Sequence, residues 1–144
     1  MRRTPAFAAA LAFAASLSPA AAETAGGQAP VLTIELNAVE PQAGACRLVF
    51  LATNALGADL SALVVETVVI DRAGKVVLLT LFDFRDLPQG RPRARQFDLA
   101  GTDCATLGRV ILNDIHACTG EGLDRAACKA GLHWSSRTDV ELLG

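Results

Sequence analysis

Apolar and polar residues alternate with a period of two through most of the chain after residue 30. In the segment 31–38, Leu32, Ile34 and Leu36 fall on one face of an extended chain, while Thr33 and Glu35 fall on the other. Alternation of this kind predicts half-buried β-strands and not helices. The same reasoning, with β-branched residues and turn signals between the segments, predicts further strands over 46–54, 60–71, 76–84, 93–99 and 108–114.

The clearest unit is a hairpin over residues 60–84. Its turn is predicted at 71–75, where Gly74 is free to adopt a positive φ. Phe82 and Phe84 share a face of the second strand, and we expect them in the core. Two further segments, 40–45 and 85–92, are rich in turn residues and are predicted to be connections.

The carboxyl-terminal third has a different pattern. Asp124 is placed to cap a short helix that ends at Gly131, and residues 132–143 then return to one strand-like segment. The sequence therefore predicts a mainly β fold, an antiparallel immunoglobulin-like sandwich of about seven strands with a short C-terminal helix and two disulfides.

The amino terminus has the features of a secretory signal peptide. Arg2 and Arg3 precede a 12-residue apolar stretch, and Ala20–Ala22 offers small residues for cleavage. We expect a signal peptide over 1–22, a flexible leader over 23–30 and a single domain over 31–144. The apolar stretch is shorter than the ~20 residues that span a bilayer, which disfavours an anchor helix. The arginine pair leaves twin-arginine export open, but its surroundings favour the general route.

Four cysteines, an even number, lie in the predicted domain: Cys46, Cys104, Cys118 and Cys128. In an exported protein such a set predicts two disulfides and a periplasmic or secreted location. Three pairings are open, and we favour Cys46 with Cys104 and Cys118 with Cys128. A zinc site is disfavoured because the chain has no C-x-x-C pair and His116 is the only nearby histidine.

The charge balance narrows the class of partner. Without Arg2 and Arg3 the chain keeps 11 basic against 15 acidic groups, a net charge of about −4. A nucleic-acid binder needs a positive surface, so we expect no nucleic-acid partner. No apolar run after residue 22 approaches membrane-spanning length, so we also expect no transmembrane segment after signal removal. The partners left are an unknown protein or a small anionic ligand.

Motifs for catalysis are missing. The serines after residue 22 are Ser61, Ser135 and Ser136, without a G-x-S-x-G motif, and the histidines are His116 and His133. The close carboxylate pairs, Asp83 with Asp86 and Asp98 with Asp103, are explained by turn capping and solvation at strand ends. We therefore assign no catalytic residue, metal ligand or cofactor, and expect no enzyme.

One set of charged residues is a candidate ligand site. Arg91, Arg93 and Arg95 would project from one side of a strand, where three guanidinium groups could clamp a carboxylate or phosphate. The competing interpretation is an exposed strand face, or a sheet edge that charge protects from pairing with other sheets.

Long segments carry a resemblance over residues 31–141, among them CRLVFLATNALGADL, VVETVVIDRAGKVV and LTLFDFRDLPQGRPRARQFDLAGTDC. They resemble an uncharacterised family of small exported proteins from alphaproteobacteria. The layout is also similar to secreted immunoglobulin-like β-sandwich modules. The resemblance implies a fold and an exported location but no activity, because fold alone does not imply function.

Three functions remain as hypotheses. The leading one is a non-catalytic envelope or secreted binding or accessory module of unknown ligand. The alternative is a structural or interaction protein without a small-molecule site. The third, which we favour least, is an enzyme of unrecognised type.

Overall fold

The computed structural model describes residues 28–144, which form eight strands and two short helical segments. The predicted signal peptide, 1–22, and the leader residues before 28 lie outside the described residues. The strands are β1 (Val31–Gln42), β2 (Ala45–Ala55), β3 (Leu60–Asp71), β4 (Val76–Leu87), β5 (Arg93–Ala100), β6 (Leu107–Gly120), β7 (Leu132–Ser136) and β8 (Glu141–Leu143). A 3-10 turn, η1 (Cys104–Thr106), precedes β6, and helix α1 (Arg125–Ala130) precedes β7.

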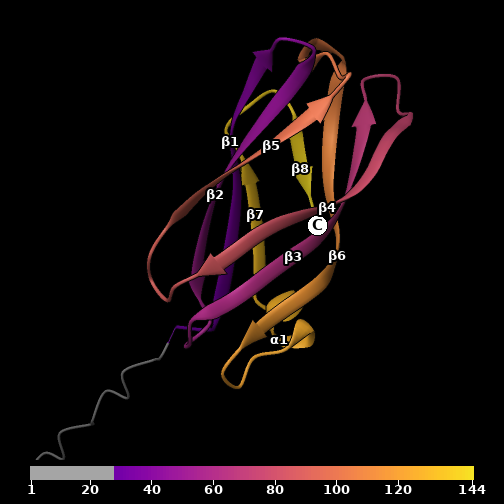
Figure 1. Cartoon of the computed structure of the whole chain (residues 1–144). Helices are drawn as coiled ribbons and strands as arrows, with labels where there is room; N and C mark the ends of the chain where they lie inside the picture. Colours follow the sequence, from indigo (N-terminus) through magenta and orange to yellow (C-terminus); the bar gives the residue numbers. More distant parts are fainter. Residues whose placement is uncertain (1–27) are drawn as a thin grey trace, which may run out of the picture.

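The strands form two sheets of four, which lie against each other (Figure 1). The strand order is β5-β2-β1-β7 in the first sheet and β4-β3-β6-β8 in the second sheet. The mainly β class predicted from the sequence is thus confirmed. The order leaves β4 and β5 as edge strands, each hydrogen-bonded to a neighbour on one side only.

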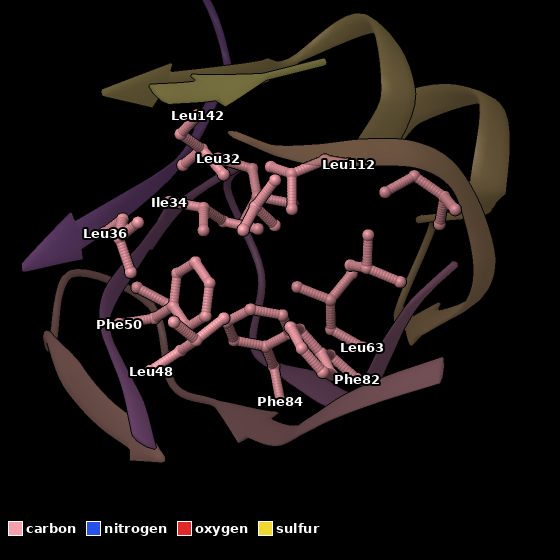
Figure 2. Close-up of a cluster of buried hydrophobic side chains, with 14 of the residues drawn as sticks. Leu32, Ile34, Leu36, Leu48, Phe50, Leu63, Phe82, Phe84, Leu112 and Leu142 are labelled. Carbon is pink, nitrogen blue, oxygen red and sulfur yellow. The ribbon is translucent and has the colours of Figure 1, made fainter. Parts of the chain in front are cut away.

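The alternation in the sequence is also the pattern of burial. Side chains at every second position of β1, β2 and β3 are buried between the sheets, and the largest fully buried ones include Leu32, Ile34, Leu36, Leu48, Phe50, Leu63 and Val65. Figure 2 shows Leu32 of β1 beside Leu112 and Leu142 of the second sheet, with Leu63 in the same cluster. Burial of this apolar surface, at about 25 cal/mol per Å², is the main stabilising contribution to the fold.

Four phenylalanines close the core between β4 and β5. The ring of Phe50 on β2 lies 5.8 Å from Phe82 and 5.7 Å from Phe84, both on β4, measured between ring centroids. Phe97 on β5 stacks on Phe82 at 4.1 Å. Phe82 and Phe84 therefore fill the core as predicted, and their contacts join the edges of the two sheets.

The structure contains both disulfides that the sequence analysis favoured. Cys46–Cys104 joins β2 to η1, and Cys118–Cys128 joins β6 to α1. The first spans 58 residues of sequence and the second spans 10. One therefore constrains the whole middle of the chain, while the other is a local constraint on the helix.

The predicted C-terminal helix is confirmed with its caps. The carboxylate of Asp124 accepts a hydrogen bond from the Ala127 N–H at 2.8 Å, which satisfies one of the free donors of the first turn. Gly131 ends the helix, and its N–H donates to the Ala127 carbonyl oxygen. Among residues 28–144 there is no helix long and apolar enough to cross a membrane.

The predicted number and direction of strands are wrong at the carboxyl end. Residues 132–143 form two strands and not one, because a turn follows Ser136, whose hydroxyl donates to the Val140 carbonyl oxygen at 2.6 Å. This turn moves the chain from the first sheet to the second. β7 then runs parallel to β1, and β8 runs parallel to β6, so the sheets are mixed and the strands number eight.

Two predicted connections are shorter than expected. β1 and β2 extend into 40–45 and leave only Ala43 and Gly44 between them. β4 continues through residues 85–87, which were predicted to belong to a connection. Arg85 adopts a φ of 59° there and donates its N–H to the Asp83 carboxylate, so the strand continues through an irregularity instead of ending.

Candidate functional site

The outward face of β4 is apolar and exposed. Among the described residues six large hydrophobic side chains are exposed, and four of them lie on β4: Val76, Val77, Leu79 and Leu81. Leu79 is the most exposed of the six, at 61%. The other two, Leu51 and Trp134, lie singly on the first sheet. Single exposed hydrophobic residues are ordinary, whereas a contiguous group marks an interaction surface.

The apolar group continues from β4 across the second sheet. Leu79 lies opposite Val68 of β3, Val68 lies opposite Ile111 of β6, and Ile111 lies opposite Leu143 of β8. Directly paired residues project from the same face of a sheet. Val68, Ile111 and Leu143 are each half-buried. We call Val77, Leu79 and Leu81 together with this row the β4 surface.

Charges flank the apolar part of β4 but do not interrupt it. Lys75 precedes the strand and Asp83 follows the apolar stretch, and the seven residues 76–82 between them carry no charge. Natural edge strands are commonly protected from pairing with other chains by charged residues, prolines or bulges. The first part of β4 has no charged residue and no proline, and its register with β3 shifts once, between Val76 and Leu78.

The last part of β4 is protected by an arginine from the other sheet. The guanidinium group of Arg95, on β5, donates to the carbonyl oxygens of Phe84 at 2.6 Å and Asp86 at 2.8 Å. One of its nitrogens also lies 3.5 Å from the Asp86 carboxylate. Arg95 therefore uses backbone acceptors that an incoming strand would otherwise bind.

A groove runs between the two edge strands. One section, of about 500 Å³, is lined by Leu81, Asp83, Arg85, Ala94, Arg95, Gln96 and Phe97. The next section, of about 420 Å³, is lined by Leu78, Thr80, Leu81 and Phe82 of β4 and by residues 96–100 of β5. Because the groove separates β4 from β5, the first part of the β4 edge is left uncovered by the first sheet.

The three candidate arginines differ in their surroundings. Arg93 and Arg95 share one face of β5 with Phe97 and Leu99, as the alternation predicts. Arg91 precedes the strand, and its backbone N–H donates to the Pro88 carbonyl oxygen. Arg91 is exposed and Arg93 half-buried. The anion clamp therefore stays a prediction, with Arg91 and Arg93 as the members whose guanidinium groups make no hydrogen bond to another described residue.

The two histidines considered for catalysis lie on different strands, and neither is buried. His116 is exposed on β6, while His133 and Ser135 are exposed on β7. The Asp103 carboxylate accepts from the Ala105 N–H and caps η1, which is the turn-capping role proposed for it. Among the described residues no group of three or more histidine, cysteine or acidic side chains is placed to hold a metal ion.

The shifted carboxylates belong to structural ion pairs. A hydrogen bond from Arg47 lowers the pKa of Asp98. This bond, 2.7 Å from Arg47 Nε to Asp98 Oδ1, also joins β2 to β5. A hydrogen bond from Lys129, aided by the Ile115 N–H, lowers the pKa of Asp114 and ties α1 to β6. The pKa of Glu35 is lowered chiefly by a hydrogen bond from Asn37. These pairs hold elements together and lie outside the β4 surface.

Sequence reasoning missed the β4 surface, although a signal was present. Residues 76–79 are Val-Val-Leu-Leu, so both faces of the strand are apolar, and strict alternation begins only at Phe82. A strand that is apolar on both faces is expected in the middle of a covered sheet. The structure places it instead at an edge, where the outward residues face solvent.

Comparisons of the chain with family models, with curated proteins and with solved structures return no match.

Proposed function

We propose that this chain is a non-catalytic binding module of an oxidising compartment, and that it binds a protein partner through the β4 surface. The exposed apolar stretch of β4 at an uncovered sheet edge carries this proposal. Such an edge can accept an extended segment of another chain by main-chain hydrogen bonds, while the alternate side chains give specificity. The alternative of an interaction protein without a small-molecule site uses the same surface.

The location is part of the proposal. Both disulfides support export to the periplasm or the exterior, because cytosolic thiols are kept reduced. The predicted signal peptide over 1–22 would provide the route. Free thiols at all four cysteines of the native protein would contradict this location.

The immunoglobulin-like arrangement also belongs to the proposal. The chain places β1 and β2 in the first sheet, β3 and β4 in the second, β5 in the first and β6 in the second. This exchange of strands between two packed sheets supports the likeness to immunoglobulin-like modules. The parallel strands β7 and β8 depart from it.

Site-specific photo-crosslinking in the native envelope tests the binding function. A photoreactive residue in place of Leu79 is expected to form a covalent adduct with a protein. The matched control is the same residue in place of Leu51, another exposed strand leucine, at 38%, on the outer face of the first sheet. Adducts at position 79 but not at 51 would support the proposal. Equal labelling at both positions, or none at 79, would overturn it.

A further inference from the structure

The outward face of the second sheet carries two carboxylates beside the β4 surface. The pairing of β3 with β4 is regular from Leu79 to Asp83, and Glu66 of β3 lies opposite Leu81. Directly paired residues, and residues two positions apart on a strand, project from the same face of a sheet. Leu81 is exposed on the outward face, so Glu66 and Asp83 project there too. The two carboxylates therefore flank Leu81, one on the neighbouring strand and one further along β4.

Neither carboxylate has a cation partner among residues 28–144. Glu66 accepts a hydrogen bond from the Asn113 side-chain amide, and Asp83 accepts one from the Arg85 backbone N–H. Both of these donor groups are neutral. The ion pairs on the outward face of this sheet involve other residues: Lys129 with Asp114, and Arg109 with Glu141. The negative charges of Glu66 and Asp83 are thus left without a salt bridge.

The nearest basic residue along β4, Arg85, does not fill this role. The register of β3 with β4 shifts after Asp83, and Arg85 lies opposite Leu63, whose side chain is fully buried. Arg85 also has a φ of 59°. The residue therefore leaves the outward alternation of β4, and no ion pair within the described part of the chain includes it.

Covering the β4 surface removes water from these carboxylates. Glu66 is half-buried already, and Leu81 beside it is 47% exposed. A partner that packs on Leu81 therefore takes water from the charge on either side of it. An ionised carboxylate that loses water without gaining a cation or new hydrogen-bond donors is strongly destabilising. A partner that binds here consequently has to supply a positive charge.

The open edge of β4 ends at the position where this charge is needed. Arg95 donates to the carbonyl oxygens of Phe84 and Asp86, so an incoming strand can pair with β4 only as far as Asp83. Outward residues of an incoming strand lie beside outward residues of β4, at intervals of two positions. Its side chains beside Leu79 and Leu81 meet apolar neighbours, and the next outward side chain meets Asp83.

We propose that the partner of the β4 surface is an extended segment of another protein with the pattern apolar-x-apolar-x-basic. This inference rests on the proposed function and deepens it, because it names the chemistry of the segment that the same surface binds. The apolar residues lie beside Leu79 and Leu81, and the lysine or arginine lies beside Asp83, with Glu66 as the second carboxylate near it. The net charge of about −4 expected for the exported chain also favours the approach of a basic segment.

Neutral variants of the two carboxylates test the attraction by photo-crosslinking in the native envelope. The probe is the photoreactive residue in place of Leu79. Glu66→Gln/Asp83→Asn removes both charges but keeps an oxygen to accept from Asn113 and from the Arg85 N–H. We expect the adduct yield at position 79 to fall at least about threefold, because the cation of the partner loses both carboxylates. An unchanged yield would overturn the inference.

The matched control is Glu40→Gln, which removes an exposed carboxylate from a strand of the first sheet. It should keep the wild-type adduct yield. An equal fall with Glu40→Gln would show that the net charge of the molecule governs binding, and would overturn the position assigned to the cation. Urea unfolding midpoints equal to that of the wild type verify that the variants are folded.

Salt tests the same attraction without a charge variant. Raising the ionic strength from about 0.1 M to about 1 M shortens the Debye length from about 10 Å to about 3 Å. The adduct yield at position 79 should fall with salt in the protein that keeps Glu66 and Asp83, and it should change less in Glu66→Gln/Asp83→Asn. A yield that does not fall in the former would contradict the proposed ion pair.

Mass spectrometry of the adduct peptides tests the pattern itself. The partner residue joined to position 79 lies beside it in the paired strand, so a lysine or arginine should precede or follow that residue by about four positions. Mapped segments without a basic residue at this distance would overturn the inference.

The two proposals fail in different ways. Absence of any adduct at position 79 overturns both. Adducts with another protein whose yield is insensitive to Glu66→Gln/Asp83→Asn overturn the basic segment and leave the binding function standing. Adducts with a second copy of this chain likewise overturn only the inference that the segment belongs to another protein.

Discussion

Arg95 on β5 donates to the carbonyl oxygen of Phe84 on β4 over 2.6 Å, although the two strands belong to different sheets. This contact lies beside the stacked rings of Phe82 and Phe97, so polar and apolar contacts close the same side of the sandwich. The residue that the sequence suggested as part of an anion clamp thus holds the two edge strands together.

Replacing Arg95 should therefore destabilise the fold. Hydrogen bonds from a charged donor contribute about 1.5–3 kcal/mol each, and Arg95→Ala removes the two that reach backbone carbonyl oxygens of β4. Because the Arg95 side chain is partly exposed, water replaces part of the lost bonds, and we expect the free energy of unfolding in urea to fall by about 2–3 kcal/mol, less than the sum of the two. The stability of Arg95→Lys should lie between that of the wild type and that of Arg95→Ala, because an ammonium group cannot reproduce the fork of the guanidinium. Arg93→Ala on the same strand is the control, and an equal loss there would contradict the role of Arg95.

The two disulfides should contribute unequally to stability. In the chain-entropy picture, a cross-link over 58 residues contributes about 4 kcal/mol and one over 10 residues about 3 kcal/mol. The double variant Cys46→Ala/Cys104→Ala should therefore unfold at a lower urea concentration than Cys118→Ala/Cys128→Ala. Urea titrations of both proteins, compared with the wild type, measure the order. The reverse order would show that local packing around α1 outweighs loop length.

Acid should weaken two specific pairs. The pKa of Asp98, beside Arg47, and that of Asp114, beside Lys129, are both lowered from the ordinary value of 3.8. A carboxylate with a lowered folded-state pKa stabilises fully above its unfolded value, and this contribution is lost as the pH falls through the folded value. We expect the urea midpoint to decline as the pH falls below 3.8.

Neutral variants of the cations show whether these pairs cause the decline. Arg47→Gln and Lys129→Gln remove the donors, so each should make the midpoint less dependent on pH. High salt should act in the same direction, because exposed pairs are screened. A wild-type pH profile in both variants would exclude these pairs as its source.

The anion clamp can be tested without disturbing Arg95. Titrations with inorganic phosphate and with succinate, followed by chemical shifts, would detect binding. If Arg91 and Arg93 hold the anion, Arg91→Ser/Arg93→Ser should abolish the shifts. Arg109→Ser/Arg125→Ser removes two other exposed arginines and should leave them unchanged. Binding that survives the first variant, or is absent from the wild type, would exclude the clamp.

Local features of the fold could be predicted from the sequence. Leu32, Ile34 and Leu36 show their burial through alternation, and Asp124 shows the helix start through its position before alanine-rich residues. These patterns depend on neighbours a few positions away, so a single sequence carries them. The pairing of Cys118 with Cys128 could be favoured for a similar reason, because these two cysteines are close along the chain.

Strand order could not be predicted in the same way. Whether β4 lies inside a sheet or at its edge depends on which distant strands pair, and Val77 and Leu79 would look the same in either position. The split of 132–143 into β7 and β8 depends on a turn whose hydroxyl contacts form only when the chain passes between sheets. Likewise, Arg95 finds the Phe84 carbonyl oxygen only because the edges of two sheets meet.

The parallel pairing of β7 with β1 determines when the first sheet can be completed during synthesis. β1 receives its second neighbour only when residues 132–136, about a hundred positions later, have been synthesised. Residues 141–143 supply β8 beside β6, so each sheet lacks an edge strand until this segment of the chain has been synthesised. Before that point both sheets of the emerging chain are incomplete. Truncation before residue 132 removes one strand from each sheet at once.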